Sequence, residues 1–248
     1  MKQTRLLMGM PVTVIVNDNQ ATAKDINDIY DYFNYVDRKF STYKEDSEIS
    51  KINRDELKAE QYSDDMKEIL KMADITRKET NGYFDIRHNG KLDPSGIVKG
   101  WAILEAAKLL ELKGFKNFYV DAGGDIQVKG KNSKGKKWTI GIRNPFSREE
   151  VVKVLEIETE GVATSGTYIR GQHVYNPYEP FKTIDDIVSL TVIGPNIFDA
   201  DRIATAAFAM KKEGIYFLEN LKGYEGYLID SKGIATMTSG FNNYVQNN

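Results

Sequence analysis

The sequence predicts an α+β fold, in which helices and a mainly antiparallel sheet are mixed in one compact domain. Helical periodicity and short strand-like segments both occur, but they do not alternate regularly as a parallel βαβ sheet requires. The chain also contains no Pro- or Ser-rich linker and no repeat period. We therefore expect residues 1–248 to form a single domain.

Apolar residues recur at helical spacing in four segments, residues 21–38, 63–80, 99–113 and 199–211. The second segment begins at a serine cap and carries aspartates in its first turn, where they interact favourably with the helix dipole. The third segment ends before Gly114, which is a typical terminator. These features predict helices that cover a sheet.

Strand-like segments make up much of the remaining chain. The β-branched run MPVTVIV (10–16) precedes the first predicted helix. KNSKGKK (131–137) is typical of a solvated hairpin tip. The other predicted strands lie at or near residues 118–122, 126–130, 137–142, 154–159, 188–194, 226–230 and 233–239.

Composition excludes several classes of function. The net charge is −2, with acidic and basic residues intermixed, so we expect no nucleic-acid partner. The chain has no cysteine and only two histidines, His88 and His173, which makes a zinc enzyme improbable. No signal-peptide cleavage site, lipidated cysteine or membrane segment is apparent, so we expect a cytoplasmic protein.

Neither common nucleotide-binding motif occurs in the chain, because G-x-x-x-x-G-K-[ST] and G-x-G-x-x-G are both absent. What remains is a series of polar clusters, five of which contain glycine. Each cluster alone is weak evidence, since a Gly-Gly pair is more often a turn than a phosphate cradle. The clusters are MGMPV, FSTYKEDSEISKIN, GYFDI, LDPSGIVKGWA, DAGGDI, ATSGTYIR, HVYNP and FDADRIATAAF.

Taken in order, these clusters resemble the ApbE-type flavin transferase family, the Mg²⁺-dependent FAD:protein FMN transferases. The resemblance extends from Met8 to about Asp230 and covers nearly the whole chain. It implies the α+β fold of that family, with FAD as substrate and Mg²⁺ as cofactor. The implied reaction is attack by a Thr or Ser hydroxyl of an acceptor flavoprotein on the FMN-side phosphorus, with release of AMP.

The helix spacing of Asp201 and Thr205 places their oxygens on one face, where both could bind a hard cation such as Mg²⁺. From spacing alone, an alternative is equally good: Asp201 in the first helical turn and a Thr205 hydroxyl that bonds back to its own helix. The resemblance favours the metal. It also implies a third ligand, the main-chain carbonyl of Gly96, three residues after Asp93.

The resemblance assigns further roles. Lys99 would add positive charge to the nucleotide site, and His173 would act as general base for the incoming hydroxyl. Core packing is the alternative for Phe84 and Met8. The residues expected to line the FAD site are Met8, Tyr43, Tyr83, Phe84, Asp85 and Asp93.

One segment departs from the family pattern. The family usually continues from its histidine with Asp-Pro and a Thr-Gly pair, but here the segment is HVYNPYEPFK, with Asn176 in place of the acid. The loop borders the catalytic region, so its change affects transfer more than FAD binding. Two hypotheses follow: a flavin transferase, or an FAD-binding carrier that at most hydrolyses FAD slowly to FMN and AMP.

Overall fold

The computed structural model describes residues 1–167 and 174–246. At its centre lies an eight-stranded sheet in the order β1-β2-β5-β6-β9-β10-β11-β12, and every neighbouring pair is antiparallel. The predicted α+β class is confirmed. The strands are β1 (Lys2–Leu7), β2 (Met10–Val16), β5 (Phe118–Ala122), β6 (Asp125–Lys129), β9 (Gly161–Gly166), β10 (Ile187–Gly194), β11 (Glu225–Asp230) and β12 (Ala235–Met237).

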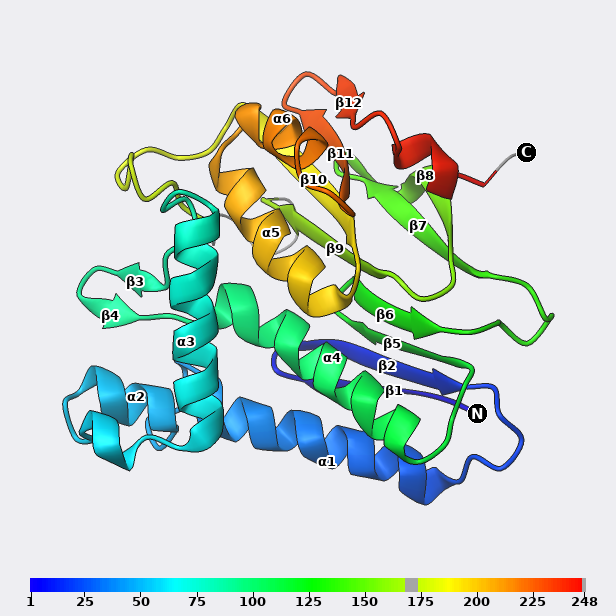
Figure 1. Cartoon of the computed structure of the whole chain (residues 1–248), viewed down its shortest axis with the longest axis horizontal. Coiled ribbons are helices and arrows are strands. Elements are labelled where there is room, and N and C mark those ends of the chain that lie inside the picture. Colours follow the sequence, from blue (N-terminus) through cyan, green and yellow to red (C-terminus); the bar gives the residue numbers. More distant parts are fainter. Residues whose placement is uncertain (168–173, 247–248) are drawn as a thin grey trace.

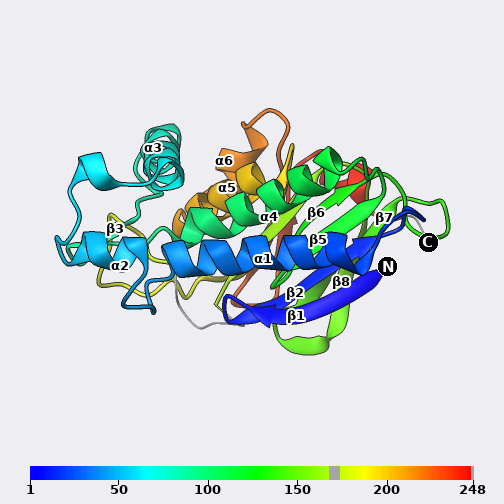
Figure 2. The ribbon, with the colours of Figure 1, turned by 90° about the horizontal axis from the view of Figure 1, so that it is seen from below.

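Three long helices cover one face of this sheet (Figures 1 and 2). The middle one, α4, packs against its neighbours α1 and α5 and against β5 and β6, so it is buried on nearly all sides. The helices are α1 (Ala23–Phe40), α2 (Glu48–Asn53), α3 (Asp64–Glu79), α4 (Ser95–Leu112), α5 (Ile197–Ala209) and α6 (Glu213–Glu219), with short 3₁₀ segments at Ala59–Gln61 and Phe241–Tyr244.

The opposite face of the sheet carries a separate two-stranded sheet, formed by β7 (Trp138–Asn144) and β8 (Ser147–Ile157). Apolar residues of this pair and of β6, β9, β10 and β11 form a second core. At one end of the molecule, α2 and α3 lie beside the short pair β3 (Arg87–His88) and β4 (Lys91–Leu92) (Figure 1).

Local chemistry explains where the first long helix begins. Thr22 caps α1, because its side chain accepts a hydrogen bond from the Asp25 N–H while the Asp25 carboxylate accepts one from the Thr22 N–H. Ile26, Ile29 and Phe33 then form the stripe that the helix buries. Asp18, which follows β2, accepts from the Asn117 N–H and so ties the end of β2 to β5.

The four predicted helices and the predicted strands all form, with bounds that differ by at most four residues, except that β8 begins seven residues before the predicted strand at 154–159. The sequence did not predict β1, β3, β4, β9, α2 or α6. Residues 131–137 are exposed as expected, but they join β6 to β7, which lie in different sheets and do not pair. Within residues 1–167 and 174–246, no helix has the length and apolarity needed to cross a bilayer.

Candidate active site

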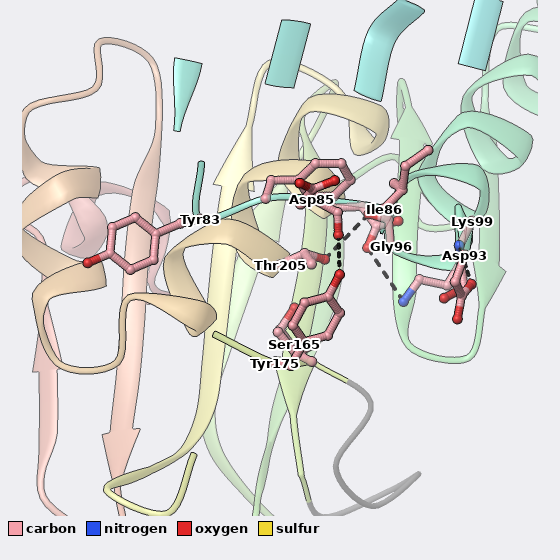
Figure 3. Close-up of a pocket in the computed structure, with 13 residues that line it drawn as sticks. Tyr83, Asp85, Ile86, Asp93, Gly96, Lys99, Ser165, Tyr175 and Thr205 are labelled. Atoms are coloured by element: carbon pink, nitrogen blue, oxygen red, sulfur yellow. Dashed lines mark hydrogen bonds and ion pairs between the residues drawn. The ribbon is translucent and has the colours of Figure 1, made fainter. Parts of the chain in front are cut away.

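A polar cavity of about 60 Å³ lies where the N-terminal part of α4 meets α5 (Figure 3). Its remaining walls come from the segment before β3, the end of β9 and the chain that follows residue 173. The volume suits a few water molecules or one phosphate-sized group, so most of a larger ligand would lie outside it. The lining residues are Tyr83, Phe84, Asp85, Ile86, Asp93, Ser95, Gly96, Lys99, Ser165, Val174, Tyr175, Asp201 and Thr205.

Two glycines allow α4 and α5 to approach closely at this cavity. A Cβ atom on Gly100 would lie 2.7 Å from the Asp201 Cβ and 2.9 Å from the Ile197 carbonyl oxygen, so no side chain fits there. One turn earlier, a Cβ atom on Gly96 would lie 3.1 Å from the Thr205 Cγ2. The close approach of the two helices therefore also brings the Gly96 carbonyl and the Thr205 side chain together.

Asp201 is a buried carboxylate, with only 3% of its surface exposed. Its Oδ2 accepts a hydrogen bond from the Gly100 N–H at 2.7 Å, and its Oδ1 lies 3.5 Å from the Lys99 Nζ. Lys99 also forms an ion pair with Asp125. Burial raises the pKa of Asp201 to about 7, while the Lys99 ammonium opposes that rise.

This trio combines two carboxylates with one ammonium, so with both acids ionised it lacks one positive charge. The Thr205 hydroxyl lies 3.4 Å from the Gly96 carbonyl oxygen and donates toward it, across to α4 and not to its own helix. The first-turn acid of α5 is Asp199, not Asp201. A carboxylate from this net-negative trio, a hydroxyl and a carbonyl thus meet at one place. These are the hard oxygen ligands that Mg²⁺ prefers.

A different metal chemistry has less support. In the described part of the chain, no three His, Cys, Asp or Glu side chains gather as a metal cluster. Mg²⁺ needs no such cluster, because it commonly binds one or two carboxylates and completes its shell with water and substrate phosphates. The residues at the cavity therefore fit Mg²⁺ in the presence of a phosphorylated ligand.

The wall before β3 is held by charged and aromatic contacts. The Asp85 carboxylate forms ion pairs with Arg77 at 3.0 Å and Arg87 at 3.4 Å. Phe84 is buried in the main core, so it packs there as well as lining the cavity. The ring of Tyr83 lies at the edge of the group drawn in Figure 3 and packs edge-on against Tyr178, with 5.0 Å between ring centroids.

Asp93 positions the beginning of α4. Its main-chain N–H donates to the Ile86 carbonyl at 2.7 Å, and its carboxylate accepts from the Ser95 N–H at 3.0 Å. These bonds fix the first turn of α4, and with it the Gly96 carbonyl, against the segment before β3. The Asp93 side chain is otherwise exposed and can accept further hydrogen bonds.

The altered loop after residue 173 is tied to the same wall. The Tyr175 hydroxyl donates to the Asp85 carbonyl at 2.6 Å, and this bond is drawn in Figure 3. Asn176 is buried, and its Oδ1 accepts from the Tyr178 N–H at 2.9 Å, so the residue holds a tight turn. Tyr178 in turn donates through its hydroxyl to the Asn81 carbonyl.

The structure brings most of the predicted site residues together, but not all. Tyr43 is 97% exposed and does not line the cavity. Met8 lies in the β1–β2 turn and packs against the main core, also away from the cavity. His173 lies outside the described residues. The residues that share the cavity are Tyr83, Phe84, Asp85, Asp93, Gly96, Lys99, Asp201 and Thr205.

Four residues at the site carry no role in the sequence analysis. Ser165 and Asp125 lie in clusters that match the family pattern, and that match is the only signal that marked them. Asp125 binds Lys99 and also accepts from the Thr164 N–H at 3.0 Å. Ser95 and Tyr175 also lie in such clusters, LDPSGIVKGWA and HVYNP, but neither was singled out there.

The fold and this cavity define an α+β protein with an oxygen-lined polar site between two closely packed helices. The chain belongs to the ApbE family, whose model matches residues 8–90 and 86–228. Curated relatives support this assignment. The chain is 30% identical over 151 residues to an FAD:protein FMN transferase of Klebsiella pneumoniae and 32% identical over 131 residues to one of Vibrio cholerae.

These alignments cover 57% and 49% of this chain, but only 43% and 39% of the relatives, so the chain spans about two fifths of their length. Solved structures match more completely. A flavin transferase ApbE from Vibrio cholerae superimposes with a TM-score of 0.86 at 22% identity over 98% of both chains. An ApbE protein from Thermotoga maritima gives 0.87 at 21% identity over 100% of this chain and 99% of the other, which supports the fold.

Proposed function

We propose that this protein is an Mg²⁺-dependent FAD:protein FMN transferase, which attaches FMN through a phosphoester bond to a Thr or Ser of an acceptor flavoprotein and releases AMP. The observation that carries the proposal is the convergence of the Gly96 carbonyl, the Asp201 carboxylate and the Thr205 hydroxyl beside Lys99. The names of the curated relatives support the same activity.

The three oxygen groups would hold the ion. Bound there, Mg²⁺ would supply positive charge that offsets the charge of the FAD pyrophosphate. Lys99 contributes in a second way, because its ammonium balances Asp125 and Asp201. Without Lys99, the Asp125 and Asp201 carboxylates would both lack this compensating charge near an anionic substrate.

The reaction forms one bond and breaks one at the same phosphorus. The acceptor oxygen bonds to the FMN-side phosphorus, the bond from that phosphorus to the oxygen of AMP breaks, and the proton leaves the acceptor hydroxyl. Such transfers depend mainly on positioning and charge stabilisation. His173 remains the candidate base for the proton, because imidazole titrates near working pH.

The wall residues would bind the nucleotide and exclude water. Tyr83 offers a flat surface for a ring, and the exposed Asp93 carboxylate can accept from ribose, ribityl or adenine donors. Since the cavity holds only one phosphate-sized group, we place one phosphate of the pyrophosphate in it and the rest of FAD, including both ring systems, outside.

One assay tests the proposal against its alternative. The purified chain is incubated with FAD, Mg²⁺ and an acceptor domain that carries a target threonine, and AMP and covalent flavin fluorescence are measured after denaturing electrophoresis. Covalent flavin on the acceptor together with AMP supports the transferase. Free FMN and AMP without covalent flavin indicate a hydrolase. FAD binding without AMP release indicates a carrier.

A further inference from the structure

A second and larger cavity, of about 600 Å³, lies on the other face of the sheet. Val12, Val14 and Val120 point into the core under the helices, so the alternate residues of the same strands face the other way. Those alternate residues, Thr13, Ile15, Tyr119 and Asp121, line this cavity. The volume falls within the usual range for a small-molecule site, roughly 300–1,000 Å³.

The β7–β8 pair covers only part of this face. Its apolar contacts are mainly with β6, β9, β10 and β11, and the half formed by β1, β2 and β5 is left as the cavity floor. Three residues form a row across this floor, because Lys2 of β1 lies opposite Ile15 of β2, and Ile15 lies opposite Tyr119 of β5. Trp138, at the beginning of β7, forms part of the wall.

One end of the cavity is strongly basic. Lys134, Lys136 and Lys137 reach it from the 131–137 turn, and Lys2 reaches it from β1. Across residues 1–167 and 174–246, none of these four ammonium groups forms an ion pair with a carboxylate. Like charges this close to one another in sequence repel, and an anion would relieve that repulsion.

The basic turn is held in one conformation. The Asn132 Oδ1 accepts from the N–H groups of Lys134 at 2.9 Å and Lys136 at 3.2 Å, and its Nδ2 donates to the Lys137 carbonyl at 2.7 Å. The Asn17 side chain donates to the Lys131 carbonyl and fixes the turn to the end of β2. The lysines therefore project from a preorganised backbone.

The rest of the cavity is aromatic and acidic, and its lining includes two carboxylates, Asp121 and Glu156, of which Glu156 accepts from the Gln246 side chain at 3.2 Å. The rings of Tyr119 and Trp138 lie 5.5 Å apart between centroids and are tilted by 39°. Beyond them, the Asp121 carboxylate accepts from the Gly124 N–H at 2.8 Å and from the Tyr119 hydroxyl at 3.3 Å, with no ion pair to a described cationic residue. It retains lone pairs for a further donor.

We propose that this cavity binds a small organic anion that carries a flat ring. Its carboxylate or phosphate would lie against the lysines of the 131–137 turn, its ring against Tyr119 and Trp138, and a hydrogen-bond donor at its far end against Asp121. This inference does not depend on the proposed flavin chemistry, because it uses none of the residues of the first cavity.

Two probes, 4-hydroxyphenylacetate and 4-hydroxyphenyl phosphate, distinguish a carboxylate ligand from a phosphate ligand, because each carries a ring hydroxyl as the donor. In a Trp101→Phe background, Trp138 is the single tryptophan and reports ligand bound beside it. We expect saturable quenching by at least one probe, unchanged by saturating FAD. The triple variant Lys134→Gln, Lys136→Gln and Lys137→Gln should raise the Kd roughly tenfold or more, because it removes charge-assisted contacts.

A control variant changes the net charge equally at exposed lysines that line neither cavity and form no ion pair with a described residue, through Lys67→Gln, Lys71→Gln and Lys222→Gln. It should leave the Kd unchanged. Equal Kd values for the two triple variants would overturn the proposal, as would displacement of the probe by FAD. So would the absence of saturable quenching by either probe in a chain whose circular dichroism is native.

Discussion

The main-chain N–H of Gly100 donates a 2.7 Å hydrogen bond to the Oδ2 of Asp201, and this bond joins α4 to α5 at the polar cavity. A hydrogen bond to a buried carboxylate is stronger than one between neutral groups. It forms only because Gly100 has no side chain, since a Cβ atom there would lie 2.7 Å from the Asp201 Cβ. The helix contact and the candidate metal ligand therefore depend on the same residue.

Gly100→Ala should lower the free energy of unfolding by about 1–3 kcal/mol, the usual cost of overpacking a well-packed interior. Gly96→Ala should cost less, because its Cβ would lie 3.1 Å from the Thr205 Cγ2 and alanine favours a helix by up to about 1 kcal/mol. Urea unfolding of both variants measures the difference. Equal stability would show that α4 and α5 can separate freely at Gly100.

Stability should also depend on pH through Asp121. Burial raises the pKa of this carboxyl above its ordinary value, so the folded state binds its proton more tightly than the unfolded state does. The contribution of Asp121 is therefore most favourable at low pH, and stability is lost as pH rises from about 4 through the folded-state pKa.

Asp121→Asn removes that titration and keeps an acceptor for the Gly124 N–H. Urea unfolding at several pH values should show the variant gaining stability relative to wild type as pH rises. A stability difference that does not change with pH would mean that Asp121 has the same pKa in both states.

The two tryptophans report on opposite faces of the sheet. Trp101 lies in the core under the helices, and Trp138 lies in the core under β7 and β8. If residues 1–248 form one domain, variants that retain only one tryptophan should unfold at the same urea concentration whichever one is present, after correction for the stability change of each substitution. Two separate midpoints would indicate that the β7–β8 layer unfolds independently.

His173→Ala tests the general base inferred from the sequence. Transfer to an acceptor should fall by roughly 10² to 10⁴, the usual contribution of such a base, while the Kd for FAD changes little. Single-turnover rates at saturating FAD measure the first effect, and a titration with FAD measures the second. If the variant transfers flavin at the wild-type rate, the base must be another group.

The sequence predicted the elements that depend on neighbouring residues and missed several that depend on pairing with other strands. The amphipathic stripe of α1 and the serine cap of α3 are local, so both helices were predicted. Strand β9, GVATSG, is rich in glycine and small polar residues and is a strand only because β6 and β10 pair with it. β1 forms because β2 pairs with it along its whole length.

The site shows the same limit. The spacing of Asp201 and Thr205 was a correct guide to a shared helix face, and the family resemblance supplied Gly96. The contact with Gly100 was not predicted, because it comes from a helix about a hundred residues away in sequence. Tyr43 was placed at the site by a motif match alone; its side chain is exposed and does not line the cavity, so its contact with FAD stays a prediction. A motif specifies which residues recur, whereas only the packing of distant segments determines which of them meet.

The most direct test of the central claim is the dependence of flavin transfer on Mg²⁺ in Asp201→Asn and Asp199→Asn. Asp201→Asn should fold, since its amide oxygen can accept from the Gly100 N–H. At the Mg²⁺ concentration that saturates the wild-type protein, however, its rate of flavin transfer should be at least about a hundredfold lower than the wild-type rate. Asp199, two residues earlier, pairs with Arg202 outside the cavity, so Asp199→Asn should retain wild-type Mg²⁺ dependence. Wild-type Mg²⁺ dependence in Asp201→Asn would contradict the assignment of this carboxylate as a metal ligand.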